Sequence, residues 1–231
     1  MVAKSEETRS LIVATALRLF AENGYDRTTM RAIAAEAGVS VGNAYYYFAS
    51  KDQLIQGFYD EIANAHLTTA RESIAGERDF SARLRTVLLT WLDVAEPYHR
   101  FGKQLFVNAA DPDSPLSPFS EESSPARDAS VGLMRDVIAD SDVKLDPDLR
   151  DDLPDLLWLY QMGVVLFWVH DRSNGQKRSR ILVERTVPLI ARLVGLSRLR
   201  VLRPVSREIV SLIRDLSKLD DPAPPRVQSS E

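Results

Sequence analysis

The chain has 231 residues, of which 45% are hydrophobic and 27% charged, and its formal net charge is −4. This composition is typical of a folded protein of one or two domains and excludes a globally disordered chain. The absence of cysteine excludes disulfides, thiolate nucleophiles and zinc-thiolate sites.

Apolar residues recur at helical spacing along the whole chain, and strand signals are nearly absent, which predicts an all-α fold. In the amino-terminal part we expect four helices, over about residues 6–22, 29–37, 40–47 and from residue 51 onward. Thr28 and Ser40 are the expected N-caps of the two short helices, because their hydroxyls can accept from backbone N–H groups.

Six further helices are expected, over about residues 80–96, 100–110, 126–139, 148–170, 176–196 and 206–219. Residues 111–125 contain four prolines, which forbid a regular helix. A loop of this length within a compact domain is usually functional or disordered. Residues 220–231 are polar and proline-rich, so we expect a disordered tail there.

The two short helices carry the residue pattern of a helix-turn-helix. Ala34 is small where the two helices must cross closely, and Gly38 allows positive φ in the turn. Val39, Ala44 and Phe48 are apolar where the second short helix must be held in place. In this motif the second helix enters the major groove of DNA.

Residues 17–54 read LRLFAENGYDRTTMRAIAAEAGVSVGNAYYYFASKDQL. This stretch resembles the DNA-binding domain of the TetR family of transcriptional regulators. The resemblance implies an all-helical homodimer with three parts: a helix-turn-helix domain over residues 1–50, a helical effector-binding and dimerisation domain over 51–219, and the tail over 220–231. It also implies a repressor that a small-molecule effector releases from a palindromic operator in double-stranded DNA.

The same resemblance implies ten positions at the DNA interface: Thr28, Thr29, Arg31, Ser40, Val41, Gly42, Asn43, Tyr45, Tyr46 and Lys51. Thr28 and Thr29 would offer hydroxyl and N–H groups to phosphate at the start of a helix. Asn43 is the expected base reader, since its amide matches an adenine edge. Tyr46 and Lys51 resemble the family's phosphate clamp, whereas Tyr45 also fits a packing role.

Aromatic and amide side chains on the middle helices are candidates for an effector cavity: Trp91, Tyr98, Phe101, Gln104, Asn108, Trp158, Gln161 and Met162. A small-molecule site needs a mostly apolar cavity with a few polar anchors, although the same aromatics also fit a filled core. Gln161 is the most informative candidate, because an unpaired amide within the apolar stretch 156–169 is costly. These residues predict a small, largely apolar effector. We expect the loop over residues 111–125 to cover the cavity entrance, because its one aromatic residue, Phe119, lies among prolines and serines; the alternative is a disordered surface loop.

The segments 148–170 and 176–196 are apolar on more than one side, so both must be buried. Joined by a short turn, they form a hairpin suited to a two-fold, four-helix dimer interface. We therefore expect a homodimer through these two segments.

Motifs of enzymes and cofactor sites are missing from the sequence. His99 and His170 lack metal-ligand spacing, and the chain has neither a nucleophile elbow nor a glycine-rich phosphate loop. We therefore expect no enzyme activity, no metal and no cofactor.

The polar first ten residues and the short apolar runs predict a cytoplasmic protein without a signal peptide or membrane span. The alternative function is a dimeric DNA-binding scaffold that responds to a protein partner and has no ligand pocket.

Overall fold

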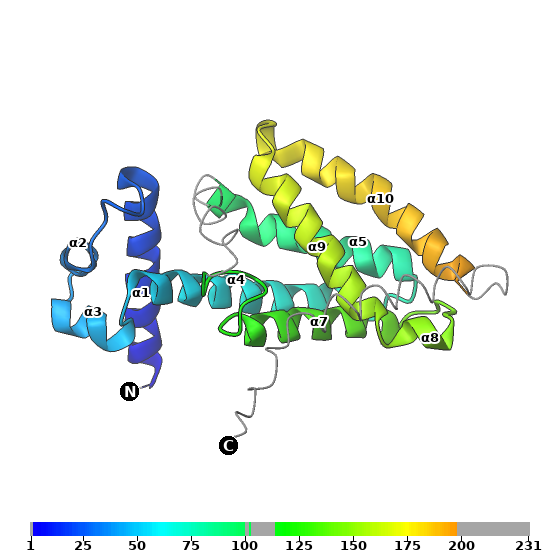
Figure 1. Ribbon diagram of the computed structural model, residues 1–231, viewed down its shortest axis with the longest axis horizontal. Helices are drawn as coiled ribbons and strands as arrows, with labels where there is room; N and C mark the ends of the chain where they lie inside the picture. Colours follow the sequence, from blue (N-terminus) through cyan, green and yellow to red (C-terminus); the bar gives the residue numbers. More distant parts are fainter. Residues whose placement is uncertain (1, 100–101, 103–113, 198–231) are drawn as a thin grey trace, which may run out of the picture.

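The computed structural model describes residues 2–99, 102 and 114–197, and within these residues it contains helices and turns but no strand (Figure 1). The predicted all-α class is confirmed. The predicted helix over 100–110, apart from residue 102, the predicted helix over 206–219 and the tail over 220–231 lie outside the described residues.

The amino-terminal domain consists of α1 (Val2–Asn23), α2 (Met30–Glu36), α3 (Val41–Tyr47) and the first two turns of α4 (Lys51–Ile74). Its helices enclose one buried apolar cluster, whose members include Ile12, Phe20, Ile33, Phe48, Leu54, Ile55 and Phe58. Because Phe58 belongs to this cluster, the core of the domain extends beyond residue 50 into α4.

The turn between α2 and α3 has the geometry that the sequence predicts. Gly38 has φ of 68°, and Ala34 is fully buried at the crossing of the two helices. Ser40 caps α3 by accepting from the N–H of Asn43 at 3.1 Å. The predicted N-cap of α2 is wrong by one residue, because Thr29 accepts from the N–H of Ala32 instead of Thr28.

The carboxy-terminal domain packs around the rest of α4, which runs out of the amino-terminal domain into the body (Figure 1). Its remaining α-helices are α5 (Phe80–Ala95), α7 (Ser124–Ala139), α8 (Pro147–Arg150), α9 (Leu153–His170) and α10 (Lys177–Leu196). Two short 3-10 helices cover Glu96–Tyr98 and Asn174–Gln176. The α9–α10 hairpin packs on α5 and α7 and completes a second apolar cluster.

The predicted single helix over residues 148–170 is wrong, because a turn at Asp151 and Asp152 divides it into α8 and α9. Pro154 lies in the first turn of α9. A helix continuing from α8 would need an N–H at Pro154 for the carbonyl of Arg150, and the proline ring would clash with that carbonyl. The first turn of a helix needs no such bond, so α9 can begin here.

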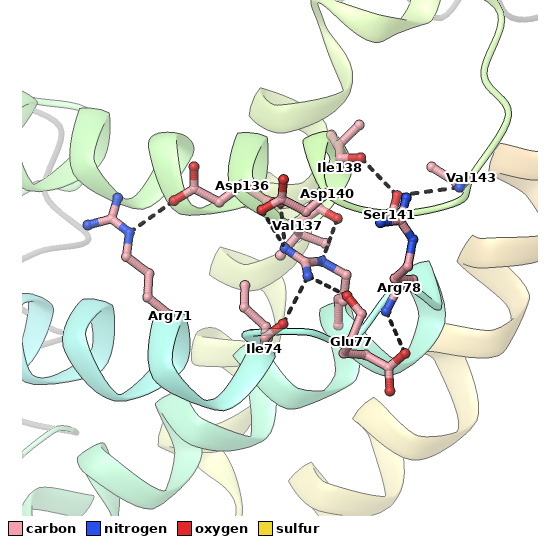
Figure 2. Close-up of polar contacts among 11 residues, drawn as sticks. Arg71, Ile74, Glu77, Arg78, Asp136, Val137, Ile138, Asp140, Ser141 and Val143 are labelled. Atoms are coloured by element: carbon pink, nitrogen blue, oxygen red, sulfur yellow. Dashed lines mark hydrogen bonds and ion pairs between the residues drawn. The ribbon is translucent and has the colours of Figure 1, made fainter.

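A buried arginine joins the ends of two helices. Arg83 of α5 is only 2% exposed, and its guanidinium donates to the carbonyls of Ile74 and Glu77 at the end of α4. It also donates to the carbonyls of Asp136 and Val137 near the end of α7 (Figure 2). These carbonyls lie at or near helix ends, where few backbone N–H groups are available, so Arg83 ties α4, α5 and α7 together.

Asp171 closes the hairpin between α9 and α10. Its carboxylate accepts from the N–H and hydroxyl of Ser173 at 2.9 and 2.7 Å, and from those of Ser179 at 2.8 Å each. Burial alone would raise the pKa of Asp171, but these four hydrogen bonds outweigh it and lower the pKa to about 2.

The lowered pKa predicts an acid-sensitive hairpin. The contribution of Asp171 to stability should be fully present above its ordinary pKa of about 4 and lost as pH falls through about 2. Urea unfolding at pH 6 should therefore show that Asp171→Asn has a lower free energy of unfolding than the parent, and this difference should become smaller at pH 2.5. A difference that stays constant with pH would show that the charge of Asp171 does not contribute to stability.

Candidate nucleic-acid interface and ligand cavity

The outer face of α3 is open to solvent. Val41, Gly42, Tyr45 and Tyr46 are exposed, and Asn43 is partly exposed. Tyr46 is 82% exposed, although it contacts Tyr47 edge-on at 5.3 Å. The structure thus brings five of the predicted DNA-contacting positions together on one surface.

The hydroxyls at the start of α2 divide between surface and core. Thr29 is exposed, whereas Thr28 is buried and donates its hydroxyl to the carbonyls of Leu19 and Gly24. The N–H of Thr28 donates to the carbonyl of Tyr25. The prediction that Thr28 offers donors to phosphate is therefore wrong, because both donors are used inside the domain. Arg31 is exposed on α2.

The amine of Lys51 is already engaged in the absence of DNA. It donates to the carbonyl of Tyr25 at 2.8 Å and lies 4.0 Å from the centre of the Tyr25 ring. The Tyr25 hydroxyl in turn donates to Asp52, so this cluster holds the start of α4 against the turn before α2. To contact a DNA phosphate, the Lys51 amine would have to form an additional interaction or give up one of those it makes with Tyr25.

A glycine in α4 sets its distance from the amino-terminal domain. A Cβ at Gly57 would lie 2.9 Å from the Phe48 ring and 3.0 Å from the guanidinium of Arg9. Only glycine permits this close approach. α4 is therefore fixed to the core of the amino-terminal domain where it enters the body.

The carboxy-terminal domain contains a partly open cavity of about 780 Å³. This volume lies within the range of small-molecule sites. Its wall is mostly apolar and aromatic, with contributions from α4, α5, α7 and α9. All three tryptophans of the chain line it: Trp91, Trp158 and Trp168.

Five of the cavity residues predicted from the sequence lie in the described part of the chain, and all five line this cavity: Trp91, Tyr98, Trp158, Gln161 and Met162. Phe101, Gln104 and Asn108 lie outside the described residues. Gln161 is buried, and its Oε1 atom has no hydrogen-bond partner among the described residues. The Trp168 Nε1–H is likewise buried and has no partner within the same ranges. A buried polar atom without a partner is costly, so these two groups are candidate anchors for a ligand.

His66 adds a neutral polar group to the cavity wall. It is buried on α4, and its Nε2–H donates to the carbonyl of Val87 at 2.9 Å. Burial lowers the pKa of His66, although the hydrogen bond to Val87 acts in the opposite direction. The imidazole is therefore uncharged at neutral pH.

One side of the cavity lies where the sequence predicts a cover. Leu116, Ser117, Pro118 and Phe119 cover this side, and Arg127 of α7, which was not among the predicted residues, lies beside them. The isolated Phe119, among prolines and serines, is the residue that indicates this arrangement in the sequence.

α9 and α10 carry a row of exposed apolar side chains: Leu159, Leu166, Phe167, Ile181, Leu189, Leu193 and Leu196. Soluble monomers rarely expose so many apolar residues on neighbouring helices, so this surface is a candidate protein interface.

In the described ranges, no group of three or more acidic or histidine side chains could hold a metal ion. Of the helices in those same ranges, none is long and apolar enough to cross a membrane.

Family models match most of the chain. Residues 12–57 match the amino-terminal model described as bacterial regulatory proteins of the tetR family. Residues 83–212 match the model of the tetracyclin repressor-like carboxy-terminal domain. Together these matches cover both domains of the fold.

Curated relatives align with about a third of the chain. The regulator TtgR of Pseudomonas putida is 39% identical over 70 residues, which are 30% of this chain and 33% of TtgR. The regulator UidR of Escherichia coli is 34% identical over 76 residues, 33% of this chain and 39% of UidR. The chain thus aligns with only about a third of the length of these relatives.

Solved structures with the same fold cover more of the chain. A TetR regulator from Nitrosomonas europaea has a TM-score of 0.60 and 22% identity, and the match covers 78% of this chain and 96% of that one. FadR of Bacillus subtilis, solved with stearoyl-CoA, has a TM-score of 0.60 and 17% identity over 77% of this chain and 96% of its own. With both domains matched by the family models, the chain belongs to the TetR family of bacterial regulatory proteins, which are DNA-binding regulators of transcription and not enzymes.

Proposed function

We propose that the protein is a homodimeric repressor that binds a palindromic operator through α3 and leaves it when a small, largely apolar effector occupies the cavity. The observation that carries this proposal is the double role of α4. Phe58 of α4 belongs to the core of the amino-terminal domain and also lines the cavity. A ligand that moves α4 therefore moves the surface that carries α3.

The dimer would form through α9 and α10, whose exposed apolar residues would be covered by a second copy. Two α3 helices related by a two-fold axis match two half-sites of a palindrome. The alternative, a scaffold controlled by a protein partner without a pocket, has less support because the carboxy-terminal domain contains a cavity of about 780 Å³.

Effector release can be tested through the tryptophans, since all three line the cavity. Ligand entry should change their fluorescence. We would titrate dodecanol, dodecanoic acid and stearoyl-CoA with and without bound operator. Because coupling is reciprocal, operator should weaken ligand binding by the same factor as ligand weakens operator binding, typically about 5–150-fold. Equal ligand affinity in both titrations would favour the scaffold alternative.

Asn43 is proposed to read a base, and Tyr46 to position the phosphate backbone. Asn43→Ala should weaken binding to the preferred operator by about 1–3 kcal/mol and relax the preference at one base pair. Tyr46→Phe should weaken binding to all sequences similarly. Fluorescence anisotropy with the operator and with single-base variants measures both effects. Asn64→Ala, the same change on an exposed position of α4, serves as the control. An unchanged base preference in Asn43→Ala would exclude Asn43 as the reader.

A further inference from the structure

Residues 114–123, which we call the strap, lead into α7 through a series of turns. The N–H of Ser117 donates to the carbonyl of Ser114, and the N–H of Ser120 donates to that of Ser117, both at 3.0 Å. The Ser120 hydroxyl donates to the carbonyl of Pro115 at 2.9 Å. The strap therefore has a defined conformation within the described part of the chain.

Leu116 joins the strap to the amino-terminal domain. Leu116 is 3% exposed and belongs to the buried cluster formed by α1, α2, α3 and the start of α4. Among the described residues, Leu116 is the one member of this cluster that comes from beyond α4. The strap thus contributes to the core on which α3 is mounted.

Leu116 and the three residues that follow it also form part of the cavity wall. Phe119 is 62% exposed and contacts the Trp158 ring edge-on at 5.4 Å. Arg127 of α7 donates to the carbonyls of Pro118 and Ser120 at 2.9 and 3.1 Å. Both Trp158 and Arg127 line the cavity, so cavity residues fix the position of the strap.

We propose that the strap is a second link between the cavity and the amino-terminal domain, parallel to α4. A ligand that displaces Phe119 or takes the guanidinium of Arg127 from the strap carbonyls would withdraw Leu116 from the core that supports α3. Arg127 is the one permanently charged side chain on the described cavity wall. The matching ligand is therefore an apolar molecule with a carboxylate or carbonyl oxygen at one end. This inference rests on the proposed effector function.

The link can be tested without DNA or effector, by hydrogen exchange of the full chain. Arg127→Met should accelerate exchange of the slowest amides in α1–α3 by about 5–30-fold, because the amino-terminal core loses part of its support. Exchange in α9 and α10 should stay unchanged, which separates the link from general destabilisation. Asp128→Ala, at the exposed neighbouring position on α7, is the matched control and should leave α1–α3 unchanged.

A double-mutant cycle then tests the role of Leu116. Leu116→Ala should accelerate the same amides, and Arg127→Met should add nothing in that background, because both act through one side chain. Leu116→Met should keep parental exchange, since it conserves volume. Phe119→Ala removes an exposed ring and should leave the protein folded. It therefore provides a second test of α1–α3 exchange if Arg127→Met does not fold.

Additive effects of Leu116→Ala and Arg127→Met, or unchanged α1–α3 exchange in both Arg127→Met and Phe119→Ala, would overturn the proposed link. Other results would contradict the proposed function. These are absent operator binding, or equal ligand affinity with and without operator, and they do not depend on the outcome of the exchange experiment.

Discussion

Replacing Leu189 and Leu193 together by arginine should give a folded monomer that binds the operator about 10²–10⁴-fold more weakly than the parent. Both side chains are exposed on α10, Leu193 at 67%, so the changes disturb no core contact within one chain. In the dimer, however, each arginine would be buried in an apolar interface without a partner. The monomer would then bind one half-site at a time.

Sedimentation measures the oligomeric state of this variant, and fluorescence anisotropy measures its operator affinity. Thr68→Arg with Ala139→Arg adds the same charge at exposed positions of α4 and α7, and this control should remain dimeric. Its operator affinity corrects for the attraction that added positive charge has for DNA. A Leu189→Arg/Leu193→Arg protein that stays dimeric would remove α9 and α10 from the proposed interface.

Arg83→Met should reduce the free energy of unfolding by about 3–5 kcal/mol. The change leaves the carbonyls of Ile74, Glu77, Asp136 and Val137 without their guanidinium donor. These carbonyls lie at or just beyond the end of α4 and near the end of α7, where few further N–H groups are available. A methionine fills part of the space but donates no hydrogen bond.

Urea unfolding followed by circular dichroism gives this free energy. Arg85→Met is the matched control on the same helix, because Arg85 is only partly buried and pairs with Glu184 at 3.8 Å. It should change the free energy of unfolding by at most about 1 kcal/mol. If Arg83→Met were as stable as Arg85→Met, the helix ends would not depend on Arg83.

The amino-terminal domain could be predicted in detail because its determinants are local. Ala34 and Gly38 are four residues apart, and each is required by the geometry of one turn. The caps Ser40 and Thr29 also depend on neighbouring residues only. The predicted roles of Thr28 as N-cap and phosphate contact are wrong because either of two adjacent threonines can cap a helix. Tertiary packing decides which of the two is buried.

The carboxy-terminal domain could be predicted only as a set of helices with candidate cavity residues. Gln161 stood out as an amide in an apolar stretch, and it lies buried at the cavity. Arg83 resembles an ordinary charged residue of an amphipathic helix, because its partner Val137 lies 54 residues away. The role of Leu116 is equally difficult to recognise in the sequence, since it packs against a domain whose other residues lie far before it in the chain.

Selection of binding sites from random duplex DNA tests the central claim most directly. The proposed dimer, with one α3 helix from each copy, predicts enrichment of a palindrome. Its half-sites should have centres separated by about one helical turn or a multiple of it, about 10–10.5 base pairs per turn. Recovery of no preferred sequence, or of a single unrepeated half-site, would contradict the account of this protein as an operator-binding dimer.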